Sequence, residues 1–238
     1  MSLYAEKAVV LRTWKLGEAD RILSLLTETH GKVRAVAKGV RKSTSRVGGR
    51  LEPFSIIDVR LWKGTGELQR IAQVDLVHGH SALHSDFLRL SKASAIMEIV
   101  DRIALEEMDS SVLFRLVTRA LGTLNEGDSP LFLGVFLLRL LELEGFAPQL
   151  DCCGICGSSE DIAYFDIETG EVACSAHAGG FELSRSVLDL LRRARAGRTR
   201  ELLGEQDPDD SRVFETIAAR YAQQSFAVEL RSLRGVIL

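Results

Sequence analysis

Hydrophobic and polar positions alternate at residues 6–14 and 53–62, with the two-residue period of strands that are buried on one face, and residues 21–27 form a further apolar run. The alternation is clearest after Pro53, where the apolar positions are Phe54, Ile56, Val59 and Leu61. We predict five strands, at residues 6–14, 21–27, 32–37, 53–62 and 68–77. Five short strands with one long loop between the third and the fourth favour a small closed β-barrel of the OB type, a fold that commonly binds single nucleic-acid strands.

The period of the hydrophobic positions becomes helical from about Ser81. Helices are predicted over residues 85–107 and 111–124, and Ser129-Pro130 has the pattern of a helix cap followed by a first helical residue. That third helix should end at Gly145, and it is apolar on nearly all sides, so we expect it at the centre of a helical bundle. A groove for a partner peptide is the alternative. Two more helices are expected, at residues 184–197 and from a polar linker at 205–210 to about Val228.

Charge is unevenly distributed along the chain. The 238 residues carry a net charge of -3, but residues 1–80 hold 14 Lys and Arg against 8 Asp and Glu. Seven cationic side chains and no acidic one lie between Lys32 and Arg50, interleaved with small residues that are typical of a loop. Such a loop can neutralise phosphates and bind nucleic acid independently of base sequence. The alternative is a solvated loop with no partner. The predicted DNA-binding residues are Arg34, Lys38, Arg41, Lys42, Arg46 and Arg50.

Few aromatic side chains are available to stack on bases in the predicted barrel. The candidates are Tyr4, Trp14, Phe54 and Trp62, and some of these must fill the core. We therefore expect electrostatic attraction to outweigh base stacking.

The cysteines have the spacing of a metal site. Cys153-Gly-Ile-Cys156 is followed, after seventeen residues, by Cys174-Ser-Ala-His177. Two such pairs can place four soft ligands around one tetrahedral Zn²⁺, and the sequence between them can form a hairpin through residues 168–170, which indicates a zinc ribbon. Cys152 is then the spare cysteine. The alternative is a site that has lost its metal and keeps its cysteines as packed or redox-labile thiols.

A predicted site of three cysteines and one histidine leaves no open position for water, so we expect a structural ion rather than a catalytic one. The segment His177-Ala-Gly lacks the glutamate of a nucleobase deaminase, and P-loop, G-x-G-x-x-G and G-x-S-x-G motifs are absent. We therefore expect no enzymatic activity. A second metal at His78, His80, His84 and Asp86 is an alternative to ordinary solvated linker histidines.

No stretch of the sequence resembles a targeting signal or a membrane span. The most apolar one, residues 131–143, is too short to cross a bilayer and contains Arg139. Four cysteines within 23 residues also favour a metal site over a dispersed disulfide framework. We therefore expect a cytoplasmic protein, associated with the nucleoid if it binds DNA.

Several strings in the sequence resemble a known family, the bacterial RecO recombination mediators. Those that resemble the family's N-terminal module are residues 16–22 (LGEADRI), 31–33 (GKV), 37–42 (AKGVRK), 45–50 (SRVGGR) and 51–54 (LEPF). Residues 145–148 (GFAP) and 150–156 (LDCCGIC), with the later Cys174-x-x-His177, are similar to its zinc segment. Many members have cysteine as the fourth ligand, so His177 departs from the pattern while remaining a zinc ligand in type.

The resemblance implies an α+β protein in which an OB barrel is followed by a helical domain that carries an inserted zinc element. The expected domains are residues 1–80 (barrel), 81–150 (first helical part), 151–181 (zinc element) and 182–238 (second helical part). It also implies a protein that binds single- and double-stranded DNA, anneals complementary strands and helps to load RecA onto strands coated by single-stranded DNA-binding protein. RecR and the acidic C-terminal tail of the coating protein are the implied partners.

Three other functional classes stay open from the residues alone. An RNA-binding or transcription-associated zinc-ribbon protein would share both the barrel and the metal. A structural adaptor would use the helices and would have no affinity for DNA. A zinc hydrolase or deaminase would need an open coordination position on the metal.

Overall fold

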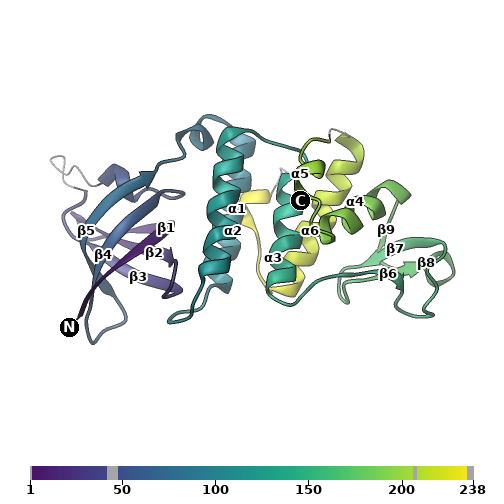
Figure 1. Cartoon of the computed structure of the whole chain (residues 1–238), viewed down its shortest axis with the longest axis horizontal. Helices are drawn as coiled ribbons and strands as arrows, with labels where there is room; N and C mark the ends of the chain where they lie inside the picture. Colours follow the sequence, from purple (N-terminus) through teal and green to yellow (C-terminus); the bar gives the residue numbers. More distant parts are fainter. Residues whose placement is uncertain (1, 42–47, 206–207, 235–238) are drawn as a thin grey trace. The chain divides into compact units, whose positions relative to one another are not determined.

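The alternating segments at the start of the chain form five strands that pair into one closed barrel. The order of pairing is β1-β2-β3-β5-β4, and β4 pairs with β1 to complete the barrel (Figure 1). Neighbouring strands are antiparallel except β3 and β5, which are parallel. The strands are β1 (Ser2–Leu16), β2 (Asp20–Thr27), β3 (Lys32–Ala37), β4 (Ile56–Lys63) and β5 (Gln69–His78).

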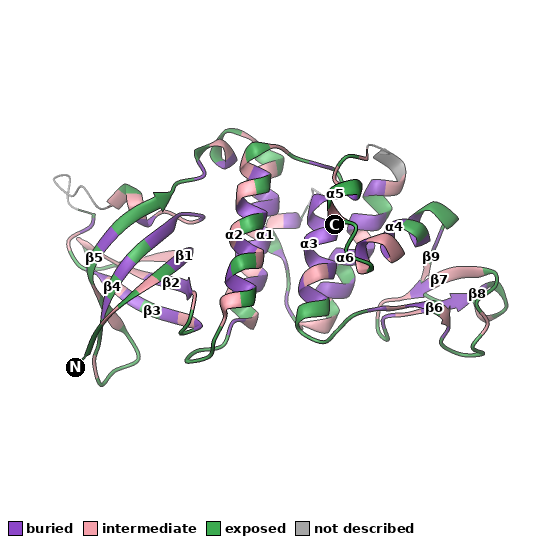
Figure 2. Ribbon diagram, in the orientation of Figure 1, coloured by how far each residue is buried: buried purple, intermediate pink, exposed green. Residues whose placement is uncertain are grey.

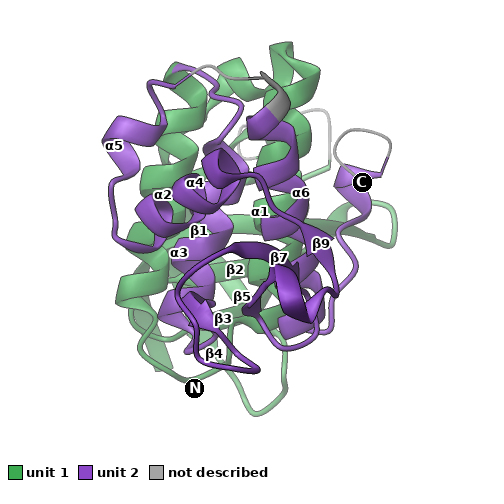
Figure 3. Ribbon diagram, turned by 90° about the vertical axis from the view of Figure 1, so that its right-hand side faces the viewer, with its two compact units in different colours: residues 1–126 green, residues 127–238 purple. Residues whose placement is uncertain are grey.

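The computed structural model describes residues 2–41, 48–205 and 208–234. The chain divides into two compact units, Met1–Glu126 and Gly127–Leu238, which are coloured separately in Figure 3. The first unit contains the barrel and two helices. The second contains the remaining helices and a small sheet that carries the cysteines.

Strand β1 can close the barrel because it is long enough to pair with two neighbours. Residues 2–9 pair with β4, and residues 8–16 pair with β2. The register shifts between Val10 and Arg12, and a bulge of this kind bends a strand and increases its twist. One continuous segment therefore serves two sides of the barrel.

The apolar half of each alternating segment fills the barrel interior (Figure 2). Leu23, Leu25, Ile57 and Leu61 have no exposed surface, and each stabilises the fold by about 1.5–3 kcal/mol relative to an exposed side chain. Tyr4 is half-buried against this core, and its hydroxyl donates a hydrogen bond of 2.7 Å to Gln69 Oε1. The other half of the alternation is left on the outside of the barrel.

Two helices complete the first unit. Helix α1 begins after Asp86, whose carboxylate accepts hydrogen bonds from two backbone N–H groups of the first turn. Its last turn is attached to the barrel through Asp101, which accepts hydrogen bonds from the Ser24 hydroxyl and, at its backbone carbonyl, from Lys32 Nζ. The helices are α1 (Phe87–Ile103) and α2 (Ser111–Glu126), and two 3-10 turns, Gly48–Leu51 and Ser81–Ser85, precede them.

The second unit is built around α3, which is buried along most of its length apart from Arg139 and its last two residues. The prediction that this apolar helix is buried is confirmed. It packs against α4 and α6, and Gly134 allows the ring of Phe214 on α6 to approach its backbone. Ser184 caps α4, as predicted, by accepting a hydrogen bond from the backbone N–H of Val187. The helices are α3 (Phe132–Leu143), α4 (Arg185–Arg195), α5 (Thr199–Leu202) and α6 (Pro208–Ser225), followed by a 3-10 turn, Arg231–Leu233.

The sheet of the second unit has four short strands in the order β6-β8-β7-β9. Strands β7 and β8 form the predicted antiparallel hairpin, which turns through Gly170 in the left-handed region at φ 73°. Strand β6 pairs with β8 in parallel, so the first cysteines lie beside the second ligand pair. The strands are β6 (Gln149–Cys153), β7 (Ile162–Asp166), β8 (Glu171–Cys174) and β9 (Phe181–Glu182).

The structure corrects the predicted start of the third helix. Ser129 and Pro130 precede the helix in a turn, and α3 begins at Phe132. The Ser129 hydroxyl accepts a hydrogen bond from the N–H of Leu131, and its carbonyl accepts one from Phe132. The serine therefore closes the turn before the helix rather than capping the helix itself.

Strands β6 and β9 and helix α5 were absent from the prediction. Helices α1 and α2 belong to the same compact unit as the barrel. The expected division into four domains stays a prediction. Within the described part of the chain, no helix is long and apolar enough to cross a membrane.

Replacing Gly134 by Ala should destabilise the second unit by about 1–3 kcal/mol, because the added methyl group would overlap the buried ring of Phe214. The midpoint of urea unfolding measures the loss. Gly122→Ala on α2 is the control, since nothing lies within 4 Å of the added methyl group. It should stabilise the protein by up to about 1 kcal/mol through helix propensity. Equal stability of the two variants would contradict the packing described for α3 and α6.

Candidate metal centre and nucleic-acid interface

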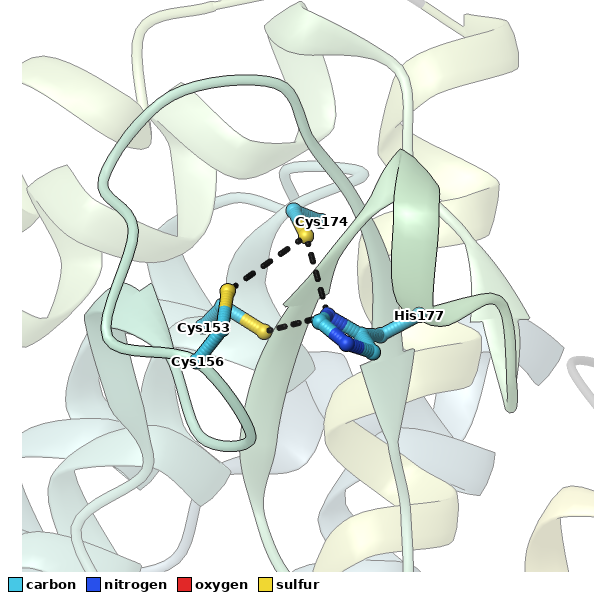
Figure 4. Close-up of side chains that lie close together, drawn as sticks. All are labelled: Cys153, Cys156, Cys174 and His177. Atoms are coloured by element: carbon cyan, nitrogen blue, oxygen red, sulfur yellow. Dashed lines mark hydrogen bonds between the residues drawn. The ribbon is translucent and has the colours of Figure 1, made fainter.

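The four predicted metal ligands lie together at one end of the small sheet (Figure 4). Cys153 ends β6 and Cys174 ends β8, and these two strands are neighbours. Cys156 lies in a tight turn in which Gly157 N–H donates to the Cys153 carbonyl at 2.8 Å, and His177 ends a 3-10 turn, Ser175–His177. Each pair is therefore a strand end followed by a short turn that brings the second ligand back.

The distances between the ligand atoms suit a single tetrahedral ion. The four atoms all lie within 4.8 Å of one another. The sulfur atoms of Cys156 and Cys174 are 3.8 Å apart, and Nδ1 of His177 is 3.3 Å from the sulfur of Cys174 and 3.7 Å from that of Cys153. Sulfur ligands about 2.3 Å from one ion are about 3.8 Å apart at the corners of a tetrahedron. The residues therefore fit a metal ion.

The surroundings of the Cys153 thiol favour its thiolate form. Its side chain is buried, and backbone N–H groups, first that of Cys174 and then that of Cys156, lower its pKa from 9.0 to about 6. The thiolate is the form that binds a metal, and at neutral pH it is the dominant form of a thiol with such a pKa. Cys152 is not part of the cluster, and its sulfur accepts a hydrogen bond of 2.9 Å from Gln149 Nε2.

The helices of the second unit hold the sheet in place. Arg192 Nε on α4 donates to the Leu150 carbonyl at 2.9 Å, and Arg195 forms an ion pair of 2.7 Å with Asp151. On the other side, Tyr221 of α6 packs edge-on against Phe165 of β7, with ring centroids 5.5 Å apart. The cluster therefore sits on a sheet attached to two helices, an arrangement that fixes the strand ends carrying the ligands.

Among the described residues, the cysteine and histidine cluster is the one group of three or more potential metal ligands. The residues of the alternative site, His78, His80, His84 and Asp86, do not form such a group within the described residues. His80 instead uses Nδ1 in a 2.9 Å hydrogen bond with the carbonyl of Phe54. Asp86 caps α1.

The predicted DNA-binding residues fall into three groups. Arg34 on β3 and Lys38 just after it are exposed, and neither side chain has a hydrogen-bond or ion-pair partner within the described residues. Lys42 and Arg46 lie outside the described residues. The side chains of Arg41 and Arg50 donate hydrogen bonds to backbone carbonyls of the first unit.

The engaged arginines hold neighbouring loops and strands. Arg41 Nη1 donates to the carbonyl of Gly17 at 2.9 Å. Arg50 donates to the carbonyl of Val74 at 3.1 Å and lies 3.4 Å from a carboxylate oxygen of Asp75. A backbone carbonyl leaves the charge of Arg41 uncompensated, whereas Asp75 offsets part of that of Arg50. Strand register also brings a cation that lies outside the predicted run, Arg12, into line with Arg34 across β2.

The fold and the clustered ligands define a mixed α+β protein with one site, within the described residues, that can hold a metal ion. The sequence matches the family profile "Recombination protein O N terminal" over residues 1–80 and "Recombination protein O C terminal" over residues 84–234. The chain belongs to the RecO family of DNA repair proteins.

Similar proteins share this family name. DNA repair protein RecO of Bifidobacterium animalis subsp. lactis is 38% identical over 240 residues, which cover 98% of this chain and 99% of that protein. The RecO protein of Thermobifida fusca is 38% identical over 242 residues, 99% of each chain. That of Bifidobacterium longum is 43% identical over 180 residues, 74% of each chain.

Replacing Cys174 by Ser should weaken metal binding strongly, because only water or a hydroxyl can take the place of the lost thiolate. The metal content of the purified protein should fall well below that of the wild type. Cys152→Ser is the matched control and should keep the metal, since the Cys152 sulfur points to Gln149. Metal retained in the Cys174 variant, or lost from the Cys152 variant, would contradict this ligand set.

Proposed function

We propose that this RecO-family protein is a non-enzymatic recombination mediator. It binds single- and double-stranded DNA, anneals complementary strands and assists the loading of RecA in recombinational repair. The observation that carries the proposal is the pair of exposed cations Arg34 and Lys38 on the outside of the barrel, whose side chains have no hydrogen-bond or ion-pair partner among the described residues. Membership of a family of DNA repair proteins supports the choice of DNA as the polyanion.

The barrel is proposed to be of the OB type. Its strand order, with β1 paired to both β2 and β4 and with β3 parallel to β5, is consistent with a five-stranded Greek-key barrel. In such barrels the face of the second and third strands, with the loops between strands 1 and 2 and between strands 4 and 5, binds oligonucleotides. Arg34 and Lys38 belong to the third strand and to the loop that follows it.

The metal is proposed to be one structural Zn²⁺ in a ribbon formed by β6, β7 and β8. Cys153, Cys156, Cys174 and His177 would hold it, and zinc bound by four protein ligands supplies folding energy rather than a reactive water. The chain's own contribution is to fix the two strand ends and to keep Cys153 as a thiolate. This arrangement supports a protein without enzymatic activity.

In the proposed mechanism, cations on the barrel hold two phosphate backbones. The residues are Arg34, Lys38, Arg41, Lys42, Arg46 and Arg50, of which Arg50 shares its charge with Asp75. Neutralising phosphates lowers the repulsion that opposes the approach of two strands. Phosphate contacts also leave the base edges free, which strand pairing requires.

The proposed partners are DNA, RecR and the acidic C-terminal tail of single-stranded DNA-binding protein, with RecA engaged indirectly. A protein with these partners would work in the cytoplasm, at the nucleoid. Its positively charged barrel and negatively charged remainder support a division of tasks, since residues 81–150 and 151–238 carry net charges of -4 and -5.

Replacing Arg34 and Lys38 together by Ala should weaken DNA binding to a similar extent for all base sequences. If each contacts one phosphate, the slope of log K against log salt on single strands should fall by about 1.4, at ~0.7 per contact. Replacing Arg41, Lys42 and Arg46 should lower it by about 2 on the same basis. Titrations at several salt concentrations measure both slopes.

The control variant replaces Arg115 and Arg119, two exposed arginines of α2, and so changes the net charge by the same amount as the Arg34 and Lys38 variant. Its salt slope should equal that of the wild type. An unchanged slope in the Arg34 and Lys38 variant would remove β3 from the interface. An equal fall in the control would show that net charge, not position, sets the affinity.

Annealing is tested with complementary strands that are already coated by single-stranded DNA-binding protein. The wild-type protein should accelerate their pairing, followed by fluorescence quenching between end-labelled strands, and the Arg34 and Lys38 variant should be slower. RNA strands serve as competitors. Failure of the wild type to accelerate pairing, or tighter binding to RNA than to DNA, would refute the proposed function.

A further inference from the structure

The structure accounts for each aromatic side chain of the barrel that could stack on a base. Phe54 is buried, and Tyr4 packs on the core with its hydroxyl bonded to Gln69. Trp14 and Trp62 therefore remain. Both are at least partly exposed, on different parts of the barrel exterior.

Trp14 lies in an apolar row that crosses three strands. It is the register partner of Ile22 on β2, and Ile22 is the partner of Val36 on β3. Residues directly opposite each other in antiparallel strands project from the same face of a sheet. The neighbouring positions Leu23 and Ala35 fill the barrel core, so the row of Trp14, Ile22 and Val36 faces outward. All three side chains are half-buried.

Cations flank this row on both sides. On one side, Arg12 lies two positions before Trp14 on β1, and Arg34 lies two positions before Val36 on β3. Both are register partners of Ser24 on β2. On the other side, Lys38 directly follows β3. Two carboxylates lie on the same face. Asp20 accepts a hydrogen bond of 2.8 Å from the backbone N–H of Gly39, and Asp101 of α1 accepts one of 2.5 Å from the Ser24 hydroxyl, so both are engaged.

The ring of Trp14 already receives a flat, positively charged group. The guanidinium carbon of Arg12 lies over it, 5.2 Å from the ring centroid. A cation–π contact at an exposed site is weak, and a base stacked on an aromatic ring is of similar or greater strength. A base can therefore replace the guanidinium, and Arg12 stays close enough to contact a phosphate of the same strand.

We propose that Trp14, with Ile22 and Val36, is a base-stacking platform that gives the barrel a preference for single-stranded over double-stranded DNA. The inference rests on the proposed function and adds a specificity-determining residue to it. Bases in a duplex are paired and stacked on each other, so an aromatic platform contacts them only in a single strand. Phosphate contacts by Arg34 and Lys38 are made with both forms.

Trp62 is the less suitable of the two tryptophans, although its residue is 41% exposed. It pairs with Leu3 on β1 and Arg70 on β5, so its row does not include β2 or β3. Those two strands form the face of OB barrels that binds oligonucleotides. Trp62 therefore provides the matched control.

The test compares a thymine oligonucleotide of about 16 nucleotides, an upper site size for one OB barrel, with an abasic strand of the same length and with duplex DNA. Trp14→Ala and Trp14→Leu should raise the Kd for the thymine strand about tenfold, the loss expected for one stacked base. Both should leave the Kd for the abasic strand, the Kd for the duplex and the salt slope unchanged. Trp14→Phe should restore most of the affinity, and Trp62→Ala should have no effect on any substrate.

Fluorescence reports on the contact directly. The chain has two tryptophans, so Trp62→Phe leaves Trp14 as the sole tryptophan emitter. Its emission should be quenched by the thymine strand and not by the abasic strand.

Three outcomes overturn the proposal. One is a Trp14→Leu variant that binds the thymine strand as tightly as the wild type, and another is an equal loss on the abasic strand. The third is a wild type that binds none of the substrates at low salt, which also refutes the proposed function. In the first two outcomes the wild type still binds DNA, so failure of the platform is distinguishable from failure of DNA binding.

Discussion

The barrel depends on the double pairing of β1. Because one strand pairs with β4 through its first half and with β2 through its second, its bend between Val10 and Arg12 determines whether the sheet can close. Closure also fixes the register, since a slip of one residue would move the core positions of β2 and β3 to the outside. The side chains on the outer face are thus positioned by the packing of the inner face. Arg12, Trp14, Arg34 and Lys38 gain their arrangement in this way, and the contact between the Arg12 guanidinium and the Trp14 ring adds to it.

This constraint explains which parts of the proposed interface could be predicted from the sequence. The pattern of apolar residues and the run of basic residues are both local features of the sequence. The five strands and the basic loop could therefore be predicted. The engagement of a particular cation is not local. Lys32 belongs to the run but donates to the carbonyl of Asp101, 69 positions along the chain, while Arg12 lies outside the run and faces the same way as Arg34. A count of basic residues along the sequence therefore includes cations that are already bonded within the protein and misses others that lie on the same face.

The expectation that electrostatics would outweigh stacking was based on the number of aromatic residues and not on their positions. A single tryptophan suffices for a platform if its row is apolar and its neighbours are cationic, and only the register of β1, β2 and β3 reveals that combination.

The start of α3 also depends on contacts that residue types do not reveal. Ser129-Pro130 has the right residue types for a helix start, but the turn uses both groups of Ser129 before the helix begins.

The cysteine cluster was more predictable because the geometry of each ligand pair is set by a few adjacent residues. The spacing identified all four candidate ligands and left Cys152 out, and the distances between ligand atoms agree with one tetrahedral ion. The spacing of the cysteines could not predict which residues support the sheet. Arg192, Arg195 and Tyr221 lie on helices, 42 to 75 residues further along the chain than their hydrogen-bond partners in residues 146–151.

Stacking and phosphate contact differ in what happens to them when two strands pair. A base that stacks on Trp14 must leave the ring to enter a duplex, so this contact opposes pairing by at most the energy of one stacked base, about 1–3 kcal/mol. Contacts with phosphates survive pairing, because the backbone stays on the outside of the duplex. A barrel that combines one stacking platform with several phosphate contacts can therefore select single strands and still tolerate the duplex that forms. It would release the paired region from Trp14 first, and retain its hold through the cations.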